Sequence, residues 1–297
     1  MPAMSSSSAA CCIALVRYLM LAFAGVSAAT AQGNGSGEKP ALKLDGNVGL
    51  RTNAGSQIAA DRDKAPDDEF PLRPDGDLGL GVFRTRSIIR GRNESPVVLP
   101  YAYIDYGRLF ARIDTIGVKT LKLGHGHLEF SGRVELDGYK TNTPALQGLS
   151  RRRDSLPLGI SSLQEFPWGA VFVDLFHDVN QSKGNLFDVA YVGKVSWGKA
   201  VLYPQAGVEY LTRQYTGYYY GVSAQEVLAT GARYRYYQPG GASNPFVAGM
   251  LEINVAANWN VNLFLRRKWL AGAIHDSPIV GSKVLDTAFL SLAYRFK

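Results

Sequence analysis

Residues 127–137, with the sequence HLEFSGRVELD, alternate between polar and apolar side chains along their whole length. One face would carry Leu, Phe, Gly, Val and Leu, and the other His, Glu, Ser, Arg, Glu and Asp. Because successive side chains of a β-strand point to opposite faces, this period of two predicts a strand with one apolar and one strongly polar face. A strand of a soluble β-sandwich, with its polar face in water, would show the same pattern.

The alternation returns along the chain in segments long enough to cross a membrane, which favours a membrane barrel. A transmembrane β-strand needs about 9–11 residues in which lipid-facing and lumen-facing positions alternate. The predicted strands are 78–88, 97–106, 108–115, 118–123, 127–138, 155–166, 169–178, 186–195, 199–213, 245–256, 259–269 and 284–296. The predicted fold is therefore all-β: a transmembrane antiparallel barrel of about twelve strands, or of ten if the short third and fourth segments form one strand.

The connections between these segments alternate in length. The short ones are 124–126, 167–168, 196–198 and 257–258, and the long ones are 139–154, 179–185, 214–244 and 270–283. Bacterial outer-membrane barrels have short periplasmic turns and longer external loops. Trp168, Trp197 and Trp259 lie at or beside short turns, where an aromatic girdle meets the membrane interface.

The polar positions of the strands define the predicted lumen of the barrel. Each of these side chains lies opposite an apolar position on its strand. The predicted lumen-facing residues are Glu129, Arg133, Glu135, Lys194, Glu209, Asn260, Asn262 and Arg266.

The last strand, 284–296, carries a recognisable ending. Ala288, Leu290, Leu292, Tyr294 and Phe296 all lie on one of its faces. This pattern resembles the closing-strand signal that the barrel-assembly machinery reads, with Tyr294 and Phe296 as its aromatic residues. The usual signal ends on the aromatic residue, so the trailing Lys297 is a departure.

Residues 1–31 differ from the rest and predict a cleaved signal peptide. Arg17 is their only charge, a short apolar stretch follows at 18–26, and the segment closes on small residues up to Ala31. A basic residue, a short apolar region and an Ala-x-Ala close are typical of secretory leaders, whereas a buried first helix is the alternative. Both cysteines, Cys11 and Cys12, fall inside this leader, so the mature chain offers no disulfide or thiolate ligand.

Residues 32–76 predict a flexible N-terminal extension, followed by the barrel at 77–297. The extension begins rich in Gly, Ser and Asn, contains a possible strand at 41–52 that would be an alternative member of the wall, and continues as a polar stretch.

Composition narrows the class of protein further. The chain is 46% hydrophobic, and no run of about 18 apolar residues follows residue 31, which argues against wholesale disorder and against a helical membrane protein. Removing Arg17 leaves 31 Lys and Arg against 25 Asp and Glu, a mature charge of +6. Because charges of both signs are spread along the chain, an anionic surface such as phospholipid or lipopolysaccharide is the expected partner, and nucleic acid is not.

The loop sequence YTGYYYGVSAQE, residues 215–226, contains a helix start signal. Ser223 and Glu226 fit a capping box, which predicts a short helix beginning at Ala224. If extended, Tyr218 and Tyr220 would share one environment and Tyr219 the opposite one. We expect this loop to fold back against the barrel mouth, and its tyrosines serve either as a constriction or docking surface or as loop packing.

Several stretches resemble the MipA/OmpV family of outer-membrane proteins, named for MltA-interacting protein. They are LPYAYIDY at 99–106, LYPQAGVEY at 202–210, YYYGVS at 218–223, YRYYQPGG at 234–241, NWNV at 258–261, DSPIV at 276–280 and YRF at 294–296. The resemblance covers roughly 77–297. At 89–91 the family tends to have an aromatic residue, Pro and Gly, where this chain has Ile, Arg and Gly. The resulting candidate docking residues are Tyr218, Tyr219, Tyr220, Gly221, Ser223, Glu226, Asp276, Ser277 and Pro278.

The resemblance implies a non-catalytic scaffold in the outer membrane. The family's namesake is understood to bring a lytic murein transglycosylase together with a penicillin-binding synthase, and other members are treated as porin-like or host-contacting proteins. A small-solute channel and a surface-contact barrel are therefore the alternatives. The best-matching motifs fall on predicted external loops, however, whereas a murein enzyme lies in the periplasm.

Other chemistry finds weaker support. The adjacent residues His275, Asp276 and Ser277 have the types of a catalytic triad, but neighbours in one loop cannot easily form its hydrogen bonds. His125 and His127 lack obvious further metal ligands, and a solvated turn is the expected structure. The run 151–153 of three arginines would suit lipopolysaccharide phosphates or a solvated loop. We expect no cofactor, no metal and no catalysis.

Overall fold

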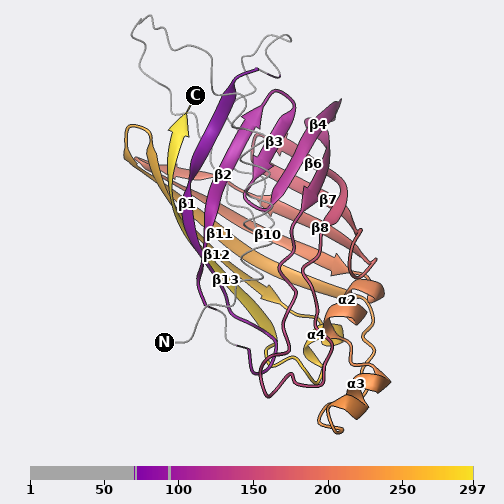
Figure 1. Cartoon of the computed structure of the whole chain (residues 1–297). Helices are drawn as coiled ribbons and strands as arrows, with labels where there is room; N and C mark the ends of the chain where they lie inside the picture. Colours follow the sequence, from indigo (N-terminus) through magenta and orange to yellow (C-terminus); the bar gives the residue numbers. More distant parts are fainter. Residues whose placement is uncertain (1–69, 71, 93–94, 297) are drawn as a thin grey trace, which may run out of the picture. The chain divides into compact units, whose positions relative to one another are not determined.

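The computed structural model describes residues 70, 72–92 and 95–296, which lie in one compact unit of the chain (Figure 1). These residues form thirteen strands, twelve of which make a closed antiparallel barrel. The strands are β1 (Pro74–Thr85), β2 (Val97–Tyr106), β3 (Leu109–Arg112), β4 (Thr115–Leu123), β5 (Gly126–Arg133), β6 (Pro157–Phe166), β7 (Gly169–Asp178), β8 (Asn185–Val192), β9 (Val195–Trp197), β10 (Ala200–Leu211), β11 (Ala242–Ala256), β12 (Trp259–Trp269) and β13 (Val284–Phe296).

The wall closes where the first strand meets the last. β1 pairs with β13 from Gly76 opposite Phe296 to Thr85 opposite Thr287, and each other wall strand pairs with its neighbours in sequence. The three-residue β9 lies outside the wall and pairs only with β10. The predicted count of twelve strands is confirmed, and the alternative of ten is wrong because β3 and β4 are separate strands paired with each other.

The ends of the predicted strands agree with the structure to within a few residues. β1 begins at Pro74, so the barrel starts inside the segment assigned to the N-terminal extension. The predicted signal peptide and the possible strand at 41–52 lie outside the described residues, and the wall closes without that strand.

Side chains alternate across the wall as the sequence pattern requires. On β5, Phe130 is 58% exposed on the outer face, whereas Glu129 and Arg133 on the same strand are buried inside. Large exposed apolar side chains form a band around the outside, and a band of this kind suits contact with lipid. It includes Leu80, Val82, Ile116, Phe130, Leu158, Val208, Leu265, Leu290 and Leu292. No helix within the described residues has the length and apolar character needed to traverse a bilayer.

The two ends of the barrel differ. The start of β1, the end of β13 and the tight turns other than 113–114 lie at one end, and Gly124 adopts a φ of +59° in one of these turns. The long loops lie at the other end and carry the helices α2 (Arg213–Tyr220), α3 (Ala224–Ala229) and α4 (Gly272–His275), as Figure 1 shows. By the usual arrangement of outer-membrane barrels, the short-turn end faces the periplasm and the long loops face outward.

Candidate functional site

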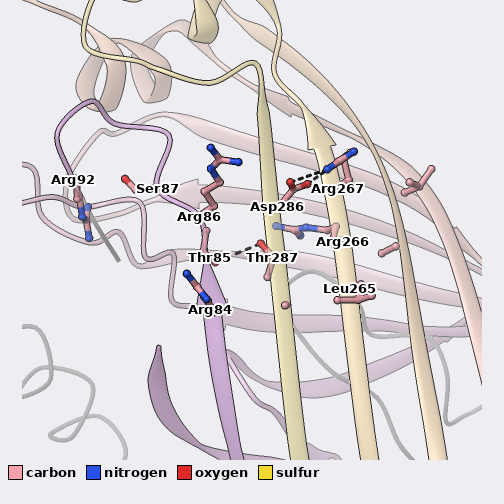
Figure 2. A pocket seen from close by; sticks show the side chains of 13 residues that line it. Arg84, Thr85, Arg86, Ser87, Arg92, Leu265, Arg266, Arg267, Asp286 and Thr287 are labelled. Carbon is pink, nitrogen blue, oxygen red and sulfur yellow. Dashed lines mark hydrogen bonds and ion pairs between the residues drawn. The ribbon is translucent and has the colours of Figure 1, made fainter. Parts of the chain in front are cut away.

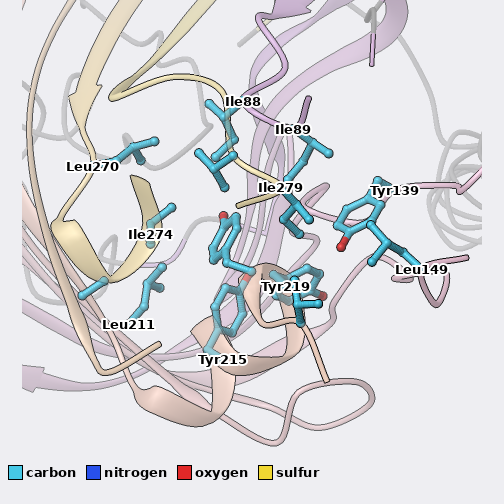
Figure 3. Close-up of a cluster of buried hydrophobic side chains, with 14 of the residues drawn as sticks. Ile88, Ile89, Tyr139, Leu149, Leu211, Tyr215, Tyr219, Leu270, Ile274 and Ile279 are labelled. Atoms are coloured by element: carbon cyan, nitrogen blue, oxygen red, sulfur yellow. The ribbon is translucent and has the colours of Figure 1, made fainter. Parts of the chain in front are cut away.

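Four external segments form a single structure over the mouth of the barrel, which we call the loop cap: residues 86–92, 134–156, 212–241 and 270–283. Their buried apolar side chains make one cluster with residues at the strand ends, as Figure 3 shows for part of it. The cluster includes Ile88, Ile89, Tyr139, Leu146, Leu149, Tyr215, Tyr219, Tyr220, Val222, Tyr234, Leu270, Ile274, Ile279 and Val280. The cap therefore has its own hydrophobic core.

The tyrosine motif lies on α2, and the expectation for an extended segment is wrong. Because α2 is helical, Tyr215 and Tyr219, one turn apart, share the buried face, with their ring centroids 4.8 Å apart. Tyr220 is also buried, and Tyr218 is half-buried. The Tyr218 hydroxyl donates to Gln181 Oε1 at 3.0 Å and accepts from the Arg153 backbone N–H at 3.2 Å.

Few local sequence signals specify α2. Thr212 at its N-cap makes no side-chain cap hydrogen bond, and Tyr is not a strong helix former. Tertiary contacts hold the helix instead: the Tyr215 hydroxyl donates to Asp137 Oδ2 at 2.9 Å, and a Cβ on Gly184 would meet the Tyr215 backbone N at 2.4 Å. Gly221 closes the helix by donating from its N–H to the Gly217 carbonyl.

The predicted helix start at Ala224 is observed, with a complete capping box. Ser223 Oγ accepts from the Glu226 N–H at 3.3 Å, and Glu226 Oε2 accepts from the Ser223 N–H at 2.8 Å. The other oxygen, Glu226 Oε1, accepts from the Ser150 N–H at 2.9 Å and from Arg152 at 2.8 Å. Burial opposes the charge, but the N–H donors of Ser223 and Ser150 and the Arg152 cation together hold the pKa of Glu226 below its ordinary value.

This contact also places the arginine run 151–153. Arg152 is mostly buried and engaged by Glu226, and its guanidinium lies 5.5 Å from the centre of the Tyr218 ring. Arg151 and Arg153 are exposed. The run therefore divides between cap structure and solvent.

The segment 276–278 joins α4 to α2. Ser277 is buried and its hydroxyl donates to the Tyr220 carbonyl oxygen at 2.6 Å. Asp276 is exposed and pairs with His275 at 2.9 Å, and Pro278 is half-buried. Because the Ser277 hydroxyl is directed to a backbone carbonyl, these three neighbours do not assemble a nucleophile and base. The sequence motifs at 218–226 and 276–278 thus contact each other inside the loop cap.

The lumen contains a second apolar core, which the sequence did not reveal. Its largest members are fully buried aromatic and sulfur-containing side chains from β2, β10, β11 and β12. The cluster comprises Phe83, Tyr101, Tyr103, Leu163, Ala170, Phe172, Ala190, Val192, Val201, Tyr203, Phe246, Met250, Phe264, Phe289 and Ala293. We call it the lumen core. The strands that supply it, such as β10 with VLYPQAGVEYL, carry apolar residues on both faces, so alternation gave no signal there.

Buried charges surround the lumen core and are paired. Arg133 faces three carboxylates: Glu135 at 2.8 Å, Asp188 at 3.1 Å and Asp174 at 3.7 Å. Glu209 Oε2 accepts from Lys268 at 2.9 Å and from Asn244 at 2.9 Å. Such pairing offsets the free-energy cost of removing these charges from water.

The other predicted lumen residues are also placed. Glu129, Asn260, Asn262 and Arg266 are buried on inward positions of β5 and β12. Glu135 lies just beyond β5 in a bridge with Ser155. Lys194 is half-buried in the connection between β8 and β9 and is not on a strand.

A cavity of about 970 Å³ lies at the outer end of β1, β11, β12 and β13 (Figure 2). Five arginines line it, with Asp286 as the acidic member of the lining. They are Arg84, Arg86, Arg92, Arg266 and Arg267. Arg266 is buried on the lumen side of β12, whereas Arg84 and Arg267 are exposed on the outer side of the wall, so the five guanidinium groups do not all face one space.

At the opposite end, aromatic side chains line part of the periplasmic rim, defined here as Phe70, His125, His127, Phe166, Trp168 and Tyr191. Trp168 is 60% exposed, stacks on Phe166 at 4.7 Å and accepts a hydrogen bond from the Tyr191 hydroxyl at its carbonyl oxygen. His125 contacts Phe166, and His127 contacts Phe70. Among the described residues, no group of three or more His, Cys, Asp or Glu side chains is placed to hold a metal ion.

The two residues of the predicted assembly signal lie near the periplasmic end of β13. Tyr294 is on the outer face, 5.4 Å from the Trp259 ring, and Phe296 pairs with Gly76 of β1. Both therefore lie at the seam where the barrel closes. Their role in assembly stays a prediction.

Comparison with known proteins agrees with this architecture. Residues 78–296 match the profile of the family described as MltA-interacting protein MipA. The putative outer membrane protein YiaT of Escherichia coli K12 is 23% identical over 223 residues, covering 74% of this chain and 90% of the relative. MltA-interacting protein of the same organism is 25% identical, covering 51% and 60%, and outer membrane protein OmpV of Vibrio cholerae is 29% identical, covering 51% and 58%.

Proposed function

The chain belongs to the MltA-interacting protein MipA family of outer-membrane proteins, and from this premise we propose that it is a closed, non-catalytic scaffold. In this proposal the barrel is anchored in the outer membrane. A murein transglycosylase and a penicillin-binding synthase dock on its periplasmic rim. One relative is named MltA-interacting protein, and none of the relatives' names given above denotes an enzyme.

The observation that carries the proposal is the closed lumen. Tyr101, Tyr203, Met250 and Phe264 are fully buried in the lumen core, and the loop cap covers the outer mouth with a separate core. In barrels of about this size, side chains fill much of the interior. Because both the lumen core and the loop cap close the barrel, a role at its surface is favoured over a role in transport.

The periplasmic rim is the part of the described structure best suited to such docking. Aromatic side chains are enriched at protein interfaces, and Trp168 is both exposed and held in place by Phe166 and Tyr191. In the loop cap, by contrast, the residues of the family motifs pack against one another. These motifs therefore have a structural role that requires no contact with a periplasmic enzyme.

Crosslinking pull-down from envelopes would test the proposal. The mature chain should recover a murein transglycosylase, and Trp168→Ala with His125→Ala should weaken recovery, because both rings lie on the rim. Trp269→Ala is the matched control, since Trp269 is 43% exposed at the outer end of β12. A chain lacking 32–69, which leaves β1 intact, measures the contribution of the extension. Recovery of no murein enzyme by any form would contradict the proposal.

A surface-contact role is the second candidate, favoured by the outer surface of the loop cap. Leu228 on α3 is 82% exposed, and Tyr236 is exposed nearby in sequence. Single exposed apolar residues are common on protein surfaces, so a direct binding assay tests this role. Loss of cell binding in Leu228→Ser with Tyr236→Ser, without loss of enzyme recovery, would support this role.

A further inference from the structure

Two arginines lie at the external end of β1, Arg84 on its outer face and Arg86 just beyond its last residue. Arg84 is exposed and follows the buried Phe83 and the exposed Val82, so it shares the lipid-facing side with Val82. Arg86, just beyond the strand, is also exposed, and its N–H donates to the Asp286 carbonyl oxygen at 3.0 Å. Within the described residues, neither guanidinium forms an ion pair with a carboxylate.

The neighbouring strands extend this cationic surface. Arg267 on β12 is held by Asp286 on β13 through two hydrogen bonds of 2.7 and 2.9 Å, as Figure 2 shows. Arg84 lies opposite Ala288, which in turn lies opposite Leu265 of β12. Because neighbouring strands are about 4.8 Å apart and Arg267 lies two residues beyond Leu265, the backbones of Arg84 and Arg267 are roughly 12 Å apart across β13. We call Arg84, Arg86, Arg267 and Asp286 the outer arginine patch.

The patch lies where the apolar band ends. One step closer to the centre of the wall than Arg84, the outer positions of β1, β13 and β12 are Val82, Leu290 and Leu263, all exposed and apolar. One step outward on β12 is Trp269, and exposed tryptophans mark the level of the headgroups. The arginines therefore lie at headgroup depth on the side of the membrane that the long loops face.

We propose that the outer arginine patch binds the phosphate groups of an outer-leaflet phosphorylated glycolipid of the lipid A type. Guanidinium groups bind phosphate through paired, charge-assisted hydrogen bonds, and the apolar band below accommodates acyl chains. Asp286 holds Arg267 and lowers the net charge, which leaves Arg84 and Arg86 as the main phosphate ligands. Arg152, in the run that the sequence suggested for this role, is engaged by Glu226. The proposal does not depend on the docking of a murein enzyme.

Native mass spectrometry of the mature chain in detergent, titrated with diphosphoryl lipid A or with phosphatidylcholine, would test this site. Arg84→Gln with Arg86→Gln should weaken lipid A binding about tenfold or more, because each surface arginine contributes measurably to anionic lipid binding. Arg151→Gln with Arg153→Gln removes the same charge from the exposed cap and should leave binding unchanged. Asp286→Asn should strengthen binding, since it removes the carboxylate of the patch.

Three results would overturn the proposal. The first is equal weakening by the two arginine pairs, which would show a general effect of net charge. The second is wild-type retention of phosphatidylcholine equal to that of lipid A. The third is complete displacement of lipid A by millimolar inorganic phosphate, which would show a site for free anions. Heat-modified mobility on gels confirms that each variant is folded before binding is compared.

Discussion

The hydroxyl of Tyr219 on α2 donates a hydrogen bond to the carbonyl oxygen of Arg153, 2.9 Å away in a different external loop. Tyr219 is fully buried, and burial together with the nearby carboxylates of Asp137 and Asp178 raises its pKa, so the phenol stays protonated as a donor. This bond joins the two longest loops of the barrel. Tyr219 thus contributes both apolar packing and a hydrogen bond to the junction of these loops, which the contacts of Tyr215 with Asp137 and of Glu226 with Ser150 also join.

Tyr219→Ala should open the loop cap. Removing a buried aromatic side chain costs about 3–5 kcal/mol, whereas Tyr219→Phe loses only the hydrogen bond, at about 1 kcal/mol. Tryptic cleavage at Arg233 and Arg235 in intact outer membranes should therefore be fast in the first variant and only slightly raised in the second. Tyr236→Ala, at an exposed cap position, is the control. Equal resistance of Tyr219→Ala and the wild type would show that α2 is not what orders the cap.

Acid should loosen the cap through Glu226. Because the folded-state pKa of Glu226 lies below its ordinary value of 4.5, its stabilising contribution is full above that value and is lost as the pH falls through the lowered pKa. Hydrogen exchange in 213–230, corrected for the intrinsic rate, should rise between pH 6 and pH 3. Glu226→Gln should exchange faster at pH 6 and lose most of this pH dependence, and Asp276→Asn serves as the exposed control. A similar pH dependence in wild type and Glu226→Gln would assign the effect to another group.

The loss of stability caused by an arginine on the outer face of β13 should depend on its depth in the membrane. Leu290→Arg places a cation in the middle of the apolar band and should cost about 2–4 kcal/mol, whereas Tyr294→Arg lies near the interface and should cost about 0–1 kcal/mol. Urea unfolding in lipid vesicles measures both on the same strand and the same face. Equal costs would mean that the outer face of β13 does not contact the hydrocarbon region.

The strands of the wall could be predicted because their two faces have different surroundings, so polar and apolar side chains alternate along the sequence. In β5, one face is apolar and exposed on the outside of the barrel, and the other carries buried charged residues, which gives the sequence a period of two. The capping box at Ser223 and Glu226 is equally local, and the helix begins where it predicts. Both features depend only on neighbouring residues.

The rest was hidden because it depends on distant contacts. α2 forms from a tyrosine-rich segment because Tyr215 and Tyr219 find a buried site between loops, which no local pattern records. The lumen core was missed for the opposite reason. Tyr101 and Tyr203 occupy strands with apolar residues on both faces, so the inward aromatic residues could not be distinguished from lipid-facing ones.

Removing residues 213–240 of the loop cap should not open a pore. A chain lacking 213–240 keeps the lumen core, so planar-bilayer recordings should stay silent for both this form and the wild type. Adding Tyr203→Ala and Phe264→Ala to the deletion should produce steady conductance, because these side chains are fully buried in the lumen core. Conductance in the wild type, or in the deletion alone, would favour a small-solute channel with the cap as its gate.

Arg133 should be the most costly lumen charge to remove. It is the cation shared by Glu135, Asp174 and Asp188, and its guanidinium also lies 4.6 Å from the Phe176 ring centre. Arg133→Met keeps most of the volume but leaves three buried carboxylates without this partner, and breaking a buried pair typically costs about 3–5 kcal/mol. Arg267→Gln breaks an exposed pair with Asp286 and should leave stability nearly unchanged. Urea unfolding in vesicles compares the two. If Asp174→Asn with Asp188→Asn restores the stability of Arg133→Met, the loss is electrostatic, whereas no restoration would assign it to packing against Phe176.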